Sequence, residues 1–200
     1  MDRRERDAYL DRVLIGGREK LEKREIAIVD YDPAWPDKFE HERDRIRRTL
    51  GPGALRVEHI GSTAVPGLAA KPIIDVLVTV EDPDDDAALA PSLESAGYEL
   101  RVREPGHRMF RTPARDVHLH VWADNDPEVE RHLIFRDQLR NSPEDRGIYE
   151  RLKRDLATRE WSDMNEYADA KSEVIAAIIA KAGCCLRADP QRRQRGALRT

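Results

Sequence analysis

The sequence lacks the long apolar segments that would place the chain in a membrane or direct it to secretion. No apolar run approaches the roughly 20 residues that a transmembrane helix needs. The N-terminal segment, MDRRERDAYL, is charged and includes no apolar stretch of the kind that a secretory signal carries. The sequence therefore predicts a cytoplasmic protein without a membrane partner.

A surplus of basic residues is also missing. The chain has 35 Lys and Arg against 39 Asp and Glu, a formal net charge of −4. Proteins that bind duplex nucleic acid usually show a basic surface, because neutralising phosphates supplies much of their affinity. The basic run RRQR at residues 192–195 lies in an expected loose tail. The charge balance therefore argues against nucleic acid as the main partner.

Cysteine is scarce, and three common catalytic or nucleotide-binding motifs are absent. Cys184 and Cys185 are adjacent, which matches no CxxC spacing of a zinc or redox site. The chain contains no GxSxG, GxxxxGK[ST] or GxGxxG motif. These absences argue against a nucleophile-elbow hydrolase, a P-loop and a Rossmann cofactor site.

The most informative stretch is residues 57–80, VEHIGSTAVPGLAAKPIIDVLVTV. Apolar, β-branched runs at 55–60 and 73–80 predict strands, the second buried on both faces. Between them, Gly61 permits a close approach of the backbone, and the hydroxyls after it can bind an anion or cap a helical turn. Asp75 interrupts the second strand, where a carboxylate needs a hydrogen bond, an ion pair or a cation.

Local patterns along the rest of the chain predict an α+β fold, a mixed sheet flanked by helices with a C-terminal helical group. Further strands are expected at residues 26–29, 98–103, 108–112 and 117–123. Helices are expected at 36–50 and 126–141, from 142 past 156, and at 163–182, where Gly183 ends the last one. Another helix is expected to begin at the acidic turn 82–86 and to end near residue 96. We expect a charged N-terminal helix within residues 1–24, one domain over 25–183, and a disordered tail over 184–200.

The Gly-Ser turn, thirteen residues before a strand carboxylate, resembles the core of polymerase-β-type nucleotidyltransferases. The segments HIGST (59–63), VPGL (65–68) and KPIID (71–75) are similar to the signature of the GrpB family, a branch of that superfamily. Further matching pieces follow in order: HLHV (118–121), HL (132–133), FRD (135–137), LR (139–140) and a helix with Tyr149, Leu152 and Lys153. The resemblance covers residues 28–182. It implies a nucleotidyltransferase-like fold in which the Gly-Ser segment holds a triphosphate and strand carboxylates hold magnesium.

One position departs from the superfamily pattern. Active members usually carry a second carboxylate two residues after the first, and here that residue is Leu77. A two-metal site needs several carboxylates to hold ions about 3.5–4 Å apart. Either histidines and another acidic residue complete the site, or the chemistry has changed or been lost.

His118 and His120 alternate along a strand, so their side chains share one face. They fit a metal pair, a phosphate- or proton-handling pair, or simply a polar sheet face. The resemblance places this strand beside that of Asp75. We therefore take Asp75, His118 and His120 as candidate catalytic residues and ligands of Mg²⁺ or another divalent cation.

The candidate phosphate-binding residues surround this trio in the predicted fold. The set is His59, Gly61, Ser62, Thr63, Lys71, Arg108 and Arg136. His59 is preferred over its neighbour Glu58, because adjacent strand residues point to opposite faces and the resemblance favours the histidine. Arg136 fits an ion pair with an acidic neighbour equally well.

Three functions remain open at this point. The first is transfer of a nucleotidyl group from a nucleoside triphosphate to an unknown acceptor. The second is a non-catalytic module that binds a nucleotide or a phosphorylated small molecule; similarity to the segment fused to dephospho-coenzyme A kinase in some bacteria links it to coenzyme A biosynthesis. The third is a scaffold that associates through its N-terminal helix. A further acidic side chain near Asp75 would favour the enzyme. The sequence leaves the oligomeric state open.

Overall fold

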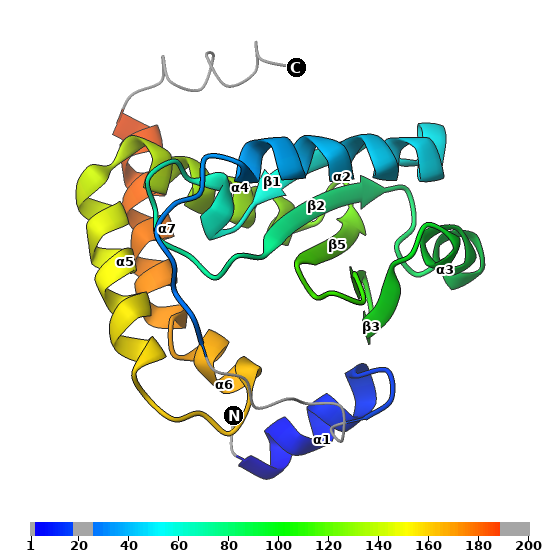
Figure 1. Ribbon diagram of the computed structural model, residues 1–200, viewed down its shortest axis with the longest axis horizontal. Helices are drawn as coiled ribbons and strands as arrows, with labels where there is room; N and C mark the ends of the chain where they lie inside the picture. The colour runs from blue at the N-terminus through cyan, green and yellow to red at the C-terminus, as the bar shows by residue number, and fades with distance from the viewer. Residues whose placement is uncertain (1–2, 18–25, 189–200) are drawn as a thin grey trace.

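The computed structural model describes residues 3–17 and 26–188, and it is built on one five-stranded sheet (Figure 1). The strands lie in the order β1-β2-β5-β4-β3. They are β1 (Arg56–Ile60), β2 (Ile74–Val80), β3 (Glu99–Glu104), β4 (His107–Arg111) and β5 (Val117–Ala123). Strand β2 pairs with β5 in parallel, and the other neighbours are antiparallel.

Helices flank this sheet, which confirms the predicted α+β fold. Helices α2 (Trp35–Leu50) and α3 (Asp86–Ser95) pack together beside it. A second group consists of α4 (Pro127–Asn141), α5 (Pro143–Ala157), α6 (Met164–Asp169) and α7 (Ser172–Ala188). Within that group α4, α5 and α7 contact one another, while α1 (Arg3–Val13) lies near α6 (Figure 1).

Strand β2 is buried on both faces, as its apolar sequence predicts. Val76 and Val78 are fully buried on the face that packs with Trp35 and Ile46 of α2. Leu77 is equally buried on the opposite face. Burying a side chain of this size contributes about 1.5–3 kcal/mol. This strand therefore fixes the position of Asp75 firmly.

The predicted helix starts are confirmed by their capping hydrogen bonds. The Asp126 carboxylate accepts from the Glu128 amide at 2.8 Å, and the Ser142 hydroxyl accepts from the Asp145 amide at 3.2 Å. In the acidic turn, the Asp85 carboxylate accepts from Ala88 at the start of α3. Such caps contribute about 0.5–2 kcal/mol each.

Two local predictions are wrong. Residues 26–29 form an isolated β-bridge between Val29 and Ala70 rather than a strand of the sheet. The expected helix over 163–182 is two helices, with a break at Ala170 and Lys171, and it does not end at Gly183. A glycine inside a helix costs only about 1 kcal/mol relative to alanine. Helix α7 therefore continues past Gly183 to Ala188.

Two other expectations are only partly covered. The expected N-terminal helix appears as α1, whereas residues 18–25 lie outside the described part of the chain, as does the expected tail over 189–200.

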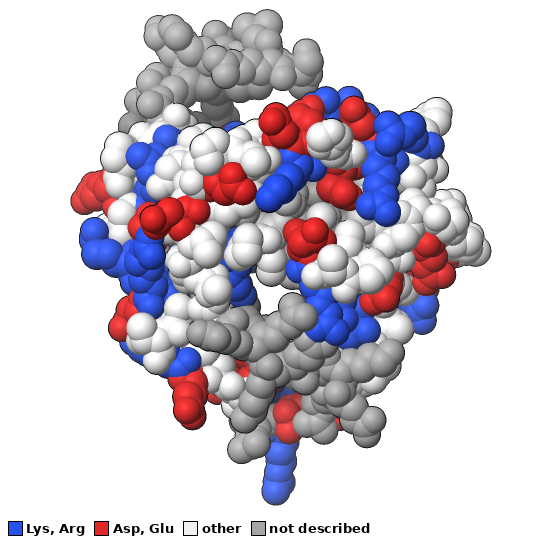
Figure 2. Space-filling model, viewed as in Figure 1, with Lys and Arg blue, Asp and Glu red and all other residues white. Residues whose placement is uncertain are grey.

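Among the described helices, none combines the length and the hydropathy needed to cross a bilayer. On the face shown in Figure 2, acidic and basic side chains are interspersed, in keeping with the balanced composition.

Candidate functional site

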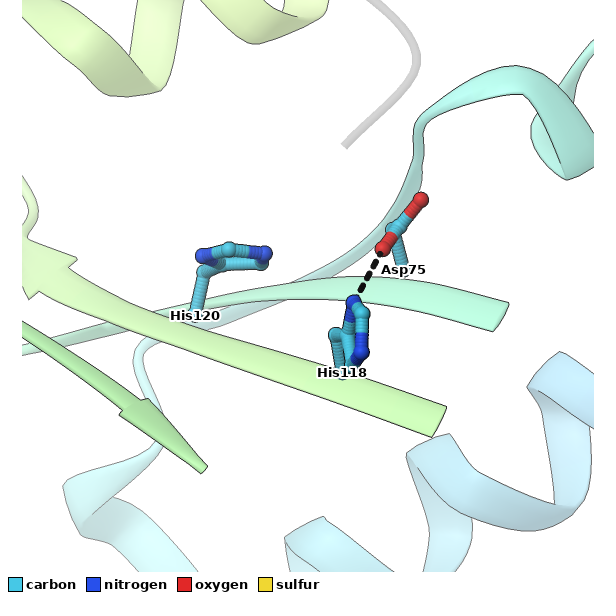
Figure 3. Close-up of side chains that lie close together, drawn as sticks. All are labelled: Asp75, His118 and His120. Carbon is cyan, nitrogen blue, oxygen red and sulfur yellow. Dashed lines mark ion pairs between the residues drawn. The ribbon is translucent and has the colours of Figure 1, made fainter. Parts of the chain in front are cut away.

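The parallel pairing of β2 with β5 brings Asp75 and two histidines together on one face of the sheet. Asp75 is the register partner of His118, and Leu77 is that of His120. The His118 Nδ1 and Asp75 Oδ1 atoms are 3.3 Å apart. One potential ligand atom from each of the three side chains lies within 4.8 Å of the other two (Figure 3).

The surroundings of Asp75 favour its carboxylate form. Burial alone raises the pKa of Asp75, but the hydrogen bond from His118 and nearby positive charge, including that of Lys71, outweigh that effect. The pKa of Asp75 is therefore lowered. Its side chain is 28% exposed and that of His118 is 29% exposed, so a ligand can reach both.

Gly61 lets the backbone pass directly over Asp75. Its φ of 70° and ψ of −171° belong to a region that only glycine adopts readily. A Cβ atom on this residue would lie 2.3 Å from Asp75 Oδ2. The sequence pattern indicated a close backbone approach here, and the structure identifies Asp75 as the group that is approached.

Ser62 connects this turn to a buried lysine. Lys153, on α5, is 3% exposed, and its Nζ donates to Ser62 Oγ at 3.0 Å and to the Ala69 carbonyl oxygen. Burial, together with the charge of Lys171, lowers the pKa of Lys153 to about 7. Lys153 is not among the site residues predicted from the sequence, because it lies in a charged helix beside many surface cations.

Two further lysines lie against the buried ring of Tyr167. The Nζ atoms of Lys71 and Lys171 are 4.4 and 4.2 Å from the ring centroid, within the range of a cation–π contact. Burial and the charge of Lys71 lower the pKa of Lys171 to about 8, and burial lowers that of Lys71. We refer to Lys71, Lys153 and Lys171 as the lysine cluster.

Two members of the predicted phosphate-binding set face away from Asp75. His59 is the register partner of Val76, so it lies on the opposite face, where its ring stacks on Phe39 at 4.6 Å. Burial lowers its pKa to about 4. Thr63 is also buried, and its hydroxyl lies 3.0 Å from the His59 ring and donates to the Ile73 carbonyl oxygen. Both residues stabilise the turn.

The expectation that His59 rather than Glu58 lies on the face of Asp75 is therefore wrong, whereas Glu58 does form an ion pair. Glu58 is the register partner of Leu77 and shares the face that carries Asp75 and His120. Its carboxylate accepts from Arg136 Nη1 at 2.7 Å, and Arg136 also donates to Asp137 at 2.7 Å. Arg136 is therefore engaged by two carboxylates beside β1.

Arg108 also lies on the face of the sheet opposite to Asp75, His118 and His120. It is the register partner of Val121, on the face covered by α2 and α3. Its guanidinium donates to Asp86 at 2.6 Å and to Asp84 at 2.8 Å, so it ties β4 to the acidic turn. Arg111 occupies the site face instead, as the register partner of His118. Strand alternation alone separates these two arginines, but the pairing of the strands decides which one faces Asp75.

The trio fits one divalent cation of the transition series better than it fits Mg²⁺. Mg²⁺ prefers six oxygen donors, whereas imidazole nitrogens suit transition-metal ions such as Fe²⁺ and Zn²⁺. Within residues 3–17 and 26–188, the group that could hold an ion consists of one carboxylate, Asp75, and two imidazoles. It includes none of the further carboxylates that a two-metal site requires.

The fold and site define an α+β protein with a carboxylate–imidazole trio next to a Gly-Ser turn and a lysine cluster. The chain belongs to the GrpB family, whose model, described as GrpB protein, matches residues 25–181.

Individual relatives agree with this assignment. A UPF0157 protein of Streptomyces coelicolor is 51% identical over 174 residues, covering 87% of this chain and 91% of that protein. The crystal structure of the conserved protein GrpB from Enterococcus faecalis matches with a TM-score of 0.70 and 39% identity, covering 78% of this chain and 96% of that chain. A dephospho-CoA kinase of Mycolicibacterium paratuberculosis is 29% identical over 181 residues, which cover 76% of this chain and 44% of that protein.

Proposed function

We propose that the chain binds a nucleoside triphosphate, or another phosphate-bearing small molecule, together with one divalent cation, and transfers a nucleotidyl group to an acceptor. One observation carries the proposal: Asp75 of the trio lies against Gly61, the next residue, Ser62, accepts a hydrogen bond from Lys153, and Lys71 and Lys171 interact electrostatically with the Asp75 carboxylate. A bound polyphosphate is stabilised when a metal ion neutralises some of its oxygens and ammonium groups neutralise others. The trio and the lysines can supply these two kinds of positive charge.

Each group of residues has a separate role in the proposed function. Asp75, His118 and His120 hold the cation, which supplies Lewis-acid neutralisation of phosphate oxygens when bound. Lys71 and Lys171 provide positive charge on the other side. Lys153 is removed from water, and its hydrogen-bond partners, Ser62 and a carbonyl oxygen, are both uncharged, so its charge is poorly compensated. A phosphate oxygen is the partner that this ammonium group lacks.

A non-catalytic binding module is the second candidate, and two observations favour it. Among the described residues, no further carboxylate joins Asp75 in the group that could hold an ion. The side chain two residues after Asp75 is Leu77, which is fully buried and cannot bind a second metal. In this case the chain binds a phosphate-bearing ligand and assists another protein that carries out the chemistry. The similarity to a dephospho-CoA kinase favours an accessory role in coenzyme A biosynthesis.

Calorimetric titration tests the proposal. ATP, GTP, CTP and UTP are added with Mn²⁺ or with Mg²⁺ to the parent, to Asp75→Asn, and to His41→Ala as a surface-histidine control. We expect binding to the parent and to His41→Ala, and at least a tenfold loss in Asp75→Asn. Absence of binding to the folded parent would contradict the proposal.

Product analysis separates the two candidates. Incubation of the bound nucleotide with candidate acceptors, followed by chromatography for released pyrophosphate, detects transfer. Pyrophosphate release that depends on Asp75 supports the enzyme. Binding that depends on Asp75 but yields no pyrophosphate supports the module.

A further inference from the structure

A second pair of side chains, Glu104 and His107, lies behind the trio. They are register partners at the end of the β3–β4 hairpin. Glu104 Oε2 is 2.9 Å from His107 Nδ1, and His107 Nε2 is 3.3 Å from His120 Nδ1. The three groups thus form one continuous hydrogen-bonded row that ends at His120.

Trp122 holds the two imidazoles in a common orientation. The His107 and His120 rings are within 8° of parallel, and the Trp122 ring stacks on His107 at 4.5 Å and lies 5.3 Å from His120. With the two rings nearly parallel and the facing nitrogens 3.3 Å apart, the geometry fits a hydrogen bond between the imidazoles. Stacking on the indole favours this common plane for both rings.

Counting protons along the row assigns a tautomer to His120. The Glu104 carboxylate can only accept, so His107 Nδ1 carries the hydrogen. With His107 neutral, its Nε2 has a lone pair and accepts, so the hydrogen of the next bond lies on His120 Nδ1. The Nε2 atom of His120 is then left without a hydrogen. Figure 3 shows one ring nitrogen of His120 on the side of Asp75 and the other on the far side.

We propose that Glu104 and His107 are positioning residues that fix His120 in its Nδ1–H tautomer and so present the Nε2 lone pair to a cation shared with Asp75 and His118. The inference rests on the cation site of the proposed function. Metal-bound histidines typically donate their second ring N–H to a fixed acceptor, and removing that acceptor costs about 10–100-fold in metal affinity. Here the acceptor is itself a histidine that a carboxylate orients.

Two substitutions of His107 separate positioning from packing. His107→Phe keeps a ring over Trp122 but has no acceptor for His120. His107→Gln supplies an amide oxygen that can accept from His120 Nδ1. We expect Mn²⁺ affinity, measured by calorimetry on the full chain, to fall about 10–100-fold in His107→Phe and to recover largely in His107→Gln. Equal Mn²⁺ affinity in the parent and His107→Phe would overturn the proposal.

The tautomer itself can be observed without any metal. Long-range ¹H–¹⁵N correlation spectra of ¹⁵N-histidine-labelled, metal-free chain distinguish Nδ1–H from Nε2–H, and the signal missing from His120→Gln identifies His120. We expect Nδ1–H in the parent and His107→Gln, and its loss in His107→Phe. An Nε2–H form of His120 in the parent would overturn the proposal. Nδ1–H in a parent that binds no Mn²⁺ would support the tautomer assignment and contradict the cation site.

Discussion

At the scale of single residues, the site depends on the absence of a side chain at Gly61. We expect Gly61→Ala to destabilise the fold by about 2 kcal/mol or more, because alanine cannot easily adopt this backbone conformation. We also expect it to weaken Mn²⁺ binding at least tenfold, since the new methyl group would displace Asp75 Oδ2. Urea denaturation and calorimetric titration measure the two effects.

Gly67 offers a matched control. It also has a positive φ, 76°, but an added Cβ would meet no atom within 4 Å. Gly67→Ala should therefore lose about 1–2 kcal/mol of stability from the backbone alone and keep the parent's Mn²⁺ affinity. If both glycine variants bound Mn²⁺ equally well, Gly61 would have no role in placing Asp75.

We predict that Lys153 makes the proposed phosphate binding depend on pH, with affinity falling as pH rises. Its pKa of about 7 means that it is charged below neutral pH and mostly neutral above it. A bound phosphate favours the charged form, so affinity should be highest near pH 6 and fall as pH rises. If the bound lysine stays protonated, the loss reaches about thirtyfold at pH 8.5.

The control for this prediction is Lys153→Met, which keeps the length of the side chain without its charge. ATP with Mn²⁺ is titrated into both proteins across the same pH range. Ionisation of the terminal phosphate affects both titrations equally, so the difference between them isolates the lysine. A parent whose affinity follows that of Lys153→Met at every pH would remove Lys153 from the binding site.

At the scale of secondary-structure elements, α1 is fastened to the helix that carries Tyr167. Arg6 Nη2 donates to both carboxylate oxygens of Asp163, at 2.6 and 2.7 Å, and Asp163 also caps α6 by accepting from two backbone amides. The Asp163 side chain is only 8% exposed. Removing the arginine therefore leaves a buried charge with backbone partners alone.

We expect Arg6→Leu to lower the free energy of unfolding by about 1–3 kcal/mol. Amide hydrogen exchange should increase first in α6, because its cap is weakened. The exposed Arg12, on the same helix, provides the control, and Arg12→Leu should change neither measurement by more than about 0.5 kcal/mol. Unchanged exchange in α6 of Arg6→Leu would show that the contact does not hold this helix in place.

Element boundaries were largely predictable, because their signals are local. The apolar run of β2, the caps at Asp126 and Ser142, and the strand at Val117–Ala123 all follow from neighbouring residues. The faces of the strands were less predictable. His59 and Glu58 alternate in any register, and only the pairing of β1 with β2 shows that Glu58 shares the face of Asp75.

Some residues of the candidate site were predictable from the sequence, and others depend on contacts between distant segments. Strand alternation and family resemblance predicted that Asp75, His118 and His120 would lie together. Lys153 could not be selected from its helix, because its burial depends on the turn at Ser62, which is distant in the sequence. His107 likewise acquires its role only through the pairing of β4 with β5.

At the scale of the whole molecule, a ligand that binds the folded chain must raise its melting temperature. With Mn²⁺ and ATP at about 100 times their dissociation constant, we expect a gain of about 2.7 kcal/mol, which corresponds to roughly 5–10 °C for a chain of this size. The measurement is a thermal melt with and without the ligands.

Asp75→Asn should show no such shift, whereas His41→Ala should shift like the parent. His41 is exposed on α2, so this control also reveals adventitious binding of Mn²⁺ to a surface imidazole. Equal shifts in the parent and in Asp75→Asn would place the ligands elsewhere on the molecule.

The parallel pairing of β2 with β5 also sets the order in which the site can be completed during synthesis. Helix α3 and the β3–β4 hairpin are made between Asp75 and His118, so the two donors belong to segments that leave the ribosome at different times. Non-local strand pairs of this kind form late, because a long loop must close first. A nascent chain that ends before β5 therefore lacks the two histidines of the trio. The proposed cation could not template early folding, and its binding would report that the sheet is complete.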